Sequence, residues 1–240
     1  MARPMNPILR LVIAVSIAIP ITIAALLMLV ESPMAIVDNV VSKLPVETVS
    51  WTGRQPAEPA VVGTWPPLKG ERYPELLLND QNGDAVRLSD FAGKVIFLEL
   101  AAIPCKGCQA FAGGQQFGGF GGVPVQPDLQ SIHHYAKRYA GVDLDADDVV
   151  FVQLLLYGSS MSSPTPEEVA GWADHFQMER TDNRIVLRGD PSMLGVETYE
   201  KIPGFHLIDE DFVLKFDSSG HHPEDDLYRD LLPALGRMTN

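Results

Sequence analysis

Two cysteines, Cys105 and Cys108, are the residues of this chain best suited to chemistry. They are the only cysteines among 240 residues, so the sequence permits one disulfide bridge or one redox pair, and no disulfide framework. A four-cysteine zinc site is excluded because its ligands do not exist. The pair follows an apolar run, residues 95–103, which predicts a buried strand.

A CxxC pair at the start of a helix has a physical use. The positive end of the helix stabilises a thiolate on the first cysteine, and the second cysteine is close enough to attack a mixed disulfide formed by the first. Lys106 lies between the two cysteines. Its cation favours a thiolate if it stays near the sulfur, and has little effect if it is solvated.

The elements that must position this pair alternate between strands and helices. Hairpins are expected at residues 76–88, with Asn82-Gly83 as the turn, and at 205–216. Apolar runs predict buried strands, and capping residues predict helices, among them one that Thr165 caps. This order implies an α/β sandwich with a mixed central sheet. The expected strands are 95–102, 149–156 and 184–187, and the expected helices are 127–139, 165–176, 191–200 and 224–238.

The N-terminal residues have the pattern of a membrane anchor. Residues 11–30 carry no charge and match the length needed to cross ~30 Å of hydrocarbon. Arg3 and Arg10 precede this run, so the positive-inside rule places residues 1–10 in the cytoplasm and the rest outside. We expect a single-pass inner-membrane protein with a periplasmic, or otherwise extracytoplasmic, domain. A cleaved signal peptide is the alternative.

A proline-rich segment follows the expected anchor. Residues 31–70 include five prolines between positions 45 and 67, a composition typical of extended spacers. This segment is therefore expected to be a stalk in front of a domain at 71–240. The alternative is that it packs on the domain or on a partner, because Trp51 and Trp65 are unfavourable in water.

The chain as a whole is acidic. Its formal net charge is −13, which argues against nucleic acid as a partner because phosphate binding needs a cationic surface.

Together these segments resemble the membrane-anchored thioredoxin-like proteins of the TlpA, ResA and redoxin type. The resemblance covers residues 72–238. It rests on LLNDQNGDAVRLSDFAGKVIFLEL, on CKGC, on IPGFHLIDEDFVLKFDSSG and on the order of the helices between them. It implies a thioredoxin-like sandwich in which Cys105 is the exposed nucleophile, Cys108 the buried resolving thiol and Pro203 a cis-proline that faces them.

The resemblance also implies a role for Glu99, six residues before Cys105. Thioredoxins carry a buried acid at the matching place, which takes up and returns the proton of the resolving cysteine. Burial would raise the pKa of such a carboxyl group. The alternative is a side chain that points to solvent.

The chain departs from the family pattern in two places. Ile103-Pro104 stands where the family has a tryptophan before the first cysteine. A Gly-rich insertion, residues 112–126, interrupts the helix after Cys108, with Phe117 and Phe120 among its glycines. Helix is not expected there. A loop of this kind is functional or disordered, and its phenylalanines could dock a partner.

The function expected from these features is thiol-disulfide exchange on protein disulfides, without cofactor or metal. One alternative is a non-catalytic thioredoxin-fold subunit of a membrane protein complex, whose CxxC is a static disulfide. Copper delivery is a further alternative, since proteins of this fold bind copper with cysteines and a histidine. His206 is expected in the core rather than at a metal, and the pairs His133-His134 and His221-His222 in solvent.

Overall fold

Five strands form the central sheet of the domain. A computed structural model describes residues 58–239. The sheet has the order β6-β5-β4-β7-β8. Strands β4, β5 and β6 are parallel, whereas β7 runs antiparallel to both β4 and β8. Their bounds are Val95–Ala102 (β4), Val149–Tyr157 (β5), Arg184–Arg188 (β6), Gly204–Ile208 (β7) and Leu214–Ser219 (β8).

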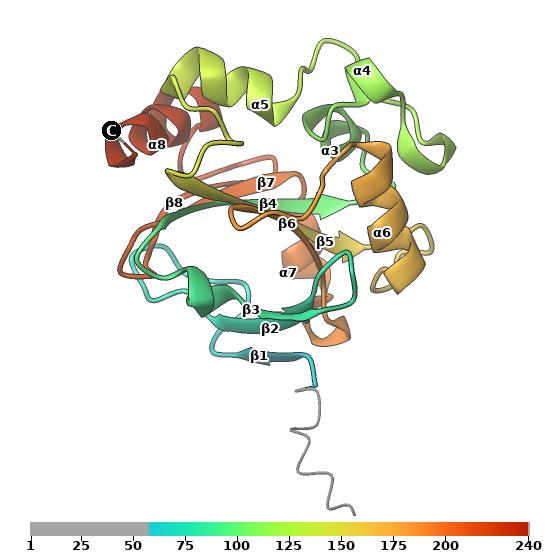
Figure 1. The fold of residues 1–240 in the computed structure, drawn as a ribbon, viewed down its shortest axis with the longest axis horizontal. Coiled ribbons are helices and arrows are strands. Elements are labelled where there is room, and N and C mark those ends of the chain that lie inside the picture. The colour runs from blue at the N-terminus through green and yellow to red at the C-terminus, as the bar shows by residue number, and fades with distance from the viewer. Residues whose placement is uncertain (1–57, 240) are drawn as a thin grey trace, which may run out of the picture. The chain divides into compact units, whose positions relative to one another are not determined.

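The two central strands are apolar along almost their whole length because both faces of the sheet are covered. Every residue of β4 and β5 is buried, as expected for strands with helices or strands on either side. Figure 1 shows helices α3, α5, α6 and α8 on one face, with a smaller sheet and α7 on the other. These helices span Lys106–Phe111 (α3), Ile132–Tyr135 (α5), Pro166–His175 (α6), Val196–Glu200 (α7) and Leu232–Met238 (α8).

The smaller sheet has three antiparallel strands in the order β1-β2-β3. Its bounds are Ala60–Val62 (β1), Glu75–Asn79 (β2) and Ala85–Arg87 (β3). The expected hairpin at 76–88 is confirmed, with Leu78 opposite Val86. Gly83 has φ +86° in its turn, a conformation that glycine adopts without a steric penalty. A single-residue bridge from Asp80 to Leu187 joins this hairpin to β6.

Residues 58–70, the C-terminal part of the expected stalk, pack on the domain. Strand β1 pairs with β2. The indole nitrogen of Trp65 donates to Met193 O at 3.1 Å and to Thr198 Oγ1 at 3.0 Å. Of the two arrangements that the sequence left open for this segment, packing therefore holds here. The domain begins before residue 71, where the sequence placed its start.

The expected helices are confirmed in position but differ in their ends. The helix expected at 165–176 is α6, and Thr165 and Glu168 form a capping box at its start. The helix expected from 127 begins only at Ile132. Its N-cap is Ser131, whose side chain accepts the N–H of His134 at 3.2 Å. Asp128, with φ +67°, lies in the left-handed region that a helix does not use.

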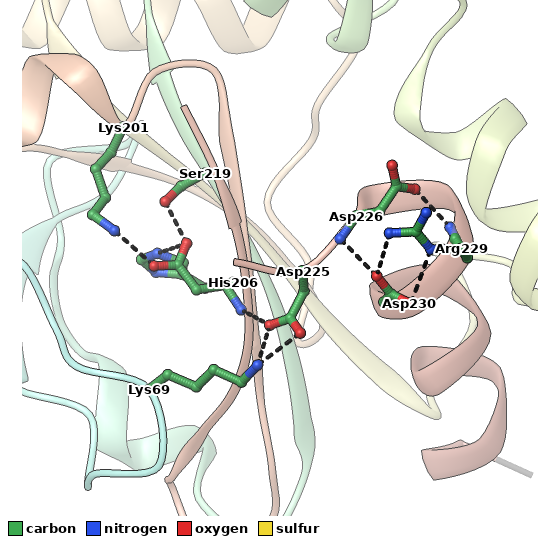
Figure 2. Close-up of polar contacts among 9 residues, drawn as sticks. Lys69, Lys201, His206, Ser219, Asp225, Asp226, Arg229 and Asp230 are labelled. Carbon is green, nitrogen blue, oxygen red and sulfur yellow. Dashed lines mark hydrogen bonds and ion pairs between the residues drawn. The ribbon is translucent and has the colours of Figure 1, made fainter. Parts of the chain in front are cut away.

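Two further helices are shorter than expected. The segment 191–200 is a single turn at Pro191–Met193 followed by α7, because Gly195 is extended between them. The last helical segment starts at Leu227 rather than 224, as a π-type turn (Leu227–Leu231) that leads into α8. Asp226 caps it by accepting the N–H of Arg229 at 2.8 Å, and its own N–H is donated to Asp230 Oδ2 at 2.9 Å (Figure 2).

The sheet order, the mixed strand directions and the position of the CxxC pair after β4 confirm the expected thioredoxin-like α/β fold. Within residues 58–239, no helix is both long enough and apolar enough to cross a membrane. The expected cytoplasmic N-terminus (1–10), the expected anchor (11–30) and residues 31–57 of the expected stalk lie outside the described residues.

Candidate active site

Cys105 and Cys108 occupy the first turn of α3, directly after the central strand. Cys105 is the N-cap residue, and its sulfur accepts the N–H of Cys108 at 3.1 Å. The side chain of Cys105 is half-buried, whereas Cys108 is buried completely. The first thiol can therefore meet a partner, and the second can be reached only through the first.

The two thiols have opposite acidities. A hydrogen bond from the Cys108 thiol, together with the backbone N–H groups of Cys108 and Gly107, lowers the pKa of Cys105 although burial opposes the shift. Burial, reinforced by Cys105 and Glu99, raises the pKa of Cys108 well above its usual value. The exposed Lys106 is not among the groups that lower the pKa of Cys105.

Glu99 is fully buried on β4, which settles the choice between a buried and a solvent-facing side chain. Burial raises its pKa to about 8, and the charge of Cys105 adds to the shift while a hydrogen bond from Gln153 opposes it. Gln153 Nε2 donates to Glu99 Oε2 at 2.7 Å. Glu99 Oε1 has no hydrogen-bond partner among the described residues, so one carboxyl oxygen is open to take a proton.

Gln153 and Trp172 fix the carboxyl group and were missed from the sequence. Gln153 lies opposite Glu99 in the parallel pairing of β4 and β5. Its Oε1 accepts the indole N–H of Trp172, on α6, at 2.8 Å. This bond holds the amide so that its NH₂ group faces Glu99. A signal existed, because Gln153 is the one polar residue in the apolar run 149–156.

Pro203 lies beside the cysteines at the start of β7. The Ile202–Pro203 bond is cis, as the resemblance implied. A methyl group built on Gly107 would lie 3.3 Å from Pro203 Cγ and 3.8 Å from Cys105 Sγ. The proline ring and the nucleophilic sulfur therefore border the same spot, and a side chain at position 107 would crowd the proline ring.

The segment that carries Pro203 is anchored to the end of β8 (Figure 2). Lys201 Nζ donates to Asp217 Oδ2 at 2.7 Å, and Ser219 donates to the other oxygen of the same carboxylate. The N–H of Gly220 lies 3.1 Å from both Lys201 O and Pro203 O. These contacts fix the position of Pro203 relative to Cys105 from the side away from α3.

The carboxylate of Asp217 remains ionised although it is buried. Burial alone would raise its pKa, but contacts with His206, Lys201 and Ser219 hold the pKa well below its usual range. The next carboxylate, Asp225, accepts the N–H of Asp217 at 2.9 Å and binds Lys69 Nζ at 2.7 Å. Figure 2 shows this series of contacts between Lys69 and Lys201. It links residues before 71 to the segment that carries Pro203.

His206 is fully buried, as expected, and belongs to the opposite face of the sheet from Glu99. It pairs with Leu98, the neighbour of Glu99 on β4, and side chains alternate between faces along a strand. Its Nδ1 lies 2.9 Å from the hydroxyl of Tyr73. Its Nε2 lies 3.5 Å from Asp217 Oδ1, which is too far for a well-formed hydrogen bond.

Metal-ligating side chains do not cluster in the described part of the chain. Across residues 58–239, no group of three or more His, Cys, Asp or Glu side chains is arranged to hold a metal ion. His206, weighed above as a possible ligand, faces away from the cysteines.

The Gly-rich insertion is built differently from the expectation. It contains a helical turn, α4 (Gly114–Phe117), and a 3-10 turn at Phe120–Gly122, where no helix was expected. Its phenylalanines are half-buried and pack on α6 and on Phe176 at its end. The ring centroid of Phe117 lies 6.4 Å from that of Phe176, and that of Phe120 lies 5.9 Å from that of Trp172.

Comparisons with known proteins show a similarity of fold only. No protein-family model matches the sequence, and no curated protein sequence matches it significantly. Solved structures do match, at low similarity.

Three of these structures illustrate the sequence identity, TM-score and coverage of the matches. The thioredoxin domain of a thiol-disulfide oxidoreductase from Bacteroides vulgatus is 14% identical, with TM-score 0.44 over 72% of this chain and 99% of that one. A thiol:disulfide interchange protein from Bacteroides sp. is 15% identical, with TM-score 0.46 over 72% and 91%. A SCO1/SenC family lipoprotein from Bacillus anthracis is 18% identical, with TM-score 0.44 over 74% and 100%. At such values the function must be inferred from the residues of this chain.

The raised pKa of Glu99 predicts a pH-dependent stability. Between its ordinary value of 4.5 and about 8, the folded state holds a proton that the unfolded state has lost, so stability falls as pH rises. At 1.36 kcal/mol per pKa unit, the loss from pH 5 to pH 8 is on the order of 3 kcal/mol. Glu99→Gln removes this loss. Urea unfolding of the oxidised proteins at pH 5, 6.5 and 8 measures it. The disulfide removes the smaller contribution of the Cys105 charge but leaves the burial that dominates the shift.

In that experiment every other group titrates equally in the two proteins, so their difference isolates Glu99. The stability of Glu99→Gln relative to the unsubstituted protein should increase with pH. Parallel pH profiles would show that Glu99 ionises in the folded state at its ordinary pKa.

The unequal thiols predict selective alkylation. After reduction, iodoacetamide at pH 7 should modify Cys105 and leave Cys108 intact, because only Cys105 is accessible and has a lowered pKa. Its rate should rise with pH around a midpoint below the free-thiol value of about 8.5. Peptide mapping by mass spectrometry locates the label, and Cys105→Ser is the control that should stay unlabelled until it is unfolded. Earlier labelling of Cys108 would reverse the assigned roles.

Proposed function

We propose that this protein is a thiol-disulfide oxidoreductase that acts on protein disulfides through Cys105 and Cys108. The observation that carries the proposal is the unequal thiol pair beside Glu99. An accessible sulfur with a lowered pKa is followed by a buried thiol with a raised pKa, and a buried acid with a pKa of about 8 lies next to them. Such perturbed groups, gathered in one place, are typical of a reactive site.

The exchange proceeds in two steps in the direction of client reduction. First, the Cys105 thiolate attacks one sulfur of the client disulfide. The client S–S bond breaks, a disulfide forms between Cys105 and the client, and the other client sulfur leaves as a thiolate. Cys108 then attacks the sulfur of Cys105 and releases the second client sulfur. Two electrons pass to the client, and the pair ends as a Cys105–Cys108 disulfide that a dithiol must reduce again.

Glu99 serves the second step. Cys108 must lose its proton to become a nucleophile, but its raised pKa opposes that loss near neutral pH. A base with a pKa near the working pH is the most effective acceptor, and the pKa of Glu99 is about 8. In the ionised form of Glu99, Oε1, which has no partner among the described residues, receives the proton, while Gln153 and Trp172 hold the carboxyl group in place.

Pro203 contributes to the accessible side of the site. Its nitrogen carries no hydrogen, so no backbone donor from this position competes for the thiolate. The contacts that fix residues 201–204 to β8 keep the ring against the spot above Gly107. A client disulfide is then presented to Cys105 along the proline ring.

Trapping of the intermediate tests the function. Cys108→Ser retains the nucleophile but removes the resolving thiol, so it should accumulate a mixed disulfide with a client that carries a disulfide. Non-reducing mass spectrometry should find the adduct on Cys105. Cys105→Ser is the matched control and should form none. A static structural disulfide, as in a non-catalytic subunit, would leave no adduct in either variant.

The same proposal includes a location. Residues 11–30 would anchor the protein in the inner membrane with the redox domain outside the cytoplasm, since the run is uncharged and follows Arg3 and Arg10. Sequencing of the mature protein from membranes should find an N-terminus that precedes residue 11. A first residue beyond Val30 would indicate a cleaved signal peptide instead.

A further inference from the structure

The insertion after Cys108 is tied to the cysteine helix rather than attached loosely to it. Gln109, on α3, is fully buried. Its Oε1 accepts the N–H of Phe120 at 2.7 Å, and its Nε2 donates to Ile103 O at 2.7 Å. One amide therefore joins the insertion to the end of β4 and to the helix that carries both thiols.

The far side of the insertion packs on α6. The ring of Phe120 meets those of Trp172 and His175, and His175 Nε2 lies 3.0 Å from Gly118 O. A methyl group built on Gly119 would collide with the backbone of Val123, so the turn is closed tightly. The insertion is thus a fixed wall beside the thiol site.

The last residue of this wall returns to the cysteines. The N–H of Gln126 is donated to Lys106 O at 3.1 Å, and Gln115 Nε2 donates to Gln126 O at 2.9 Å. A methyl group built on Gly107 would lie 3.3 Å from Gln126 Oε1, the same distance as from Pro203 Cγ. The carboxamide therefore borders the spot that Cys105 and Pro203 also border.

The side-chain carboxamide of Gln126 is also available to bind a client. The side chain is exposed, and it makes no hydrogen bond within residues 58–239. A carboxamide both donates and accepts, as a peptide group does. On the other border of the site, the N–H of Ile202 is already donated to Tyr199 O at 3.2 Å, so it is not free for a client.

We propose that Gln126 is a specificity-determining residue whose carboxamide hydrogen-bonds the peptide backbone of the client beside the disulfide that Cys105 attacks. This inference rests on the proposed function and adds a substrate class, an extended peptide segment around a cysteine. Clients without a peptide group at that place lose the interaction and react through the thiols alone.

Two probes with the same leaving group separate this role from the chemistry. One is 2-hydroxyethyl disulfide, which has no peptide group, and the other is a linear peptide whose single cysteine carries a disulfide to 2-mercaptoethanol. Gln126→Met keeps the length of the side chain but cannot hydrogen-bond. Its second-order rate with the peptide should fall about 3- to 10-fold, the range expected for one neutral hydrogen bond, and its rate with 2-hydroxyethyl disulfide should stay unchanged.

The matched control is Gln116→Met, the same change at an exposed position of the same insertion. Both of its rates should equal those of the unsubstituted protein, and the pH profile of Cys105 alkylation should be the same in all three proteins. An unchanged peptide rate in Gln126→Met, or an equal fall with both probes, would overturn the inference and leave the exchange function standing. Failure of the unsubstituted protein with both probes would overturn the exchange function, and the inference with it.

Discussion

The site depends on one constraint, the burial of β4 between two strands that run in opposite directions. Parallel β5 on one side places Gln153 opposite Glu99, and antiparallel β7 on the other side begins opposite Leu100. The chain leaves β4 at Ala102 and enters β7 at Gly204, so the cysteines and Pro203 meet at one end of the sheet. Strand register brings the two segments to the same end of the sheet, and the contacts of Lys201 and Gly220 then hold Pro203 in place.

The sheet separates two sets of ionisable groups, one on each of its faces. Glu99 and the thiols are on the helical face, and their charges oppose one another, so their pKa values spread apart. His206 and Asp217 are on the face covered by the small sheet, and contacts of Asp217 with His206, Lys201 and Ser219 hold the pKa of this buried carboxyl group well below its usual range. Glu99 can change its protonation near neutral pH, whereas the Asp217 carboxylate supports the Pro203 segment through Lys201.

Much of this arrangement could be predicted from the sequence. The strands follow from unbroken apolar runs, and the order of strands and helices, together with CKGC, indicates the fold. The helix ends could not be predicted in the same way. The left-handed Asp128 and the extended Gly195 set these ends, and neither residue type is restricted to those conformations. The fixed wall was missed because its order comes from Gln109 and α6, residues outside the Gly-rich segment.

Strand β1 has a consequence for how the domain is produced in isolation. The sequence suggests a natural boundary at residue 71, but β1, Trp65 and Lys69 all precede it. A recombinant fragment that begins at 71 would lack them, so it would leave one edge of β2 unpaired and Asp225 without its ammonium partner. Unpaired strand edges are templates for pairing between molecules. Residues 58–70 therefore belong to any fragment meant to keep this edge of β2 paired.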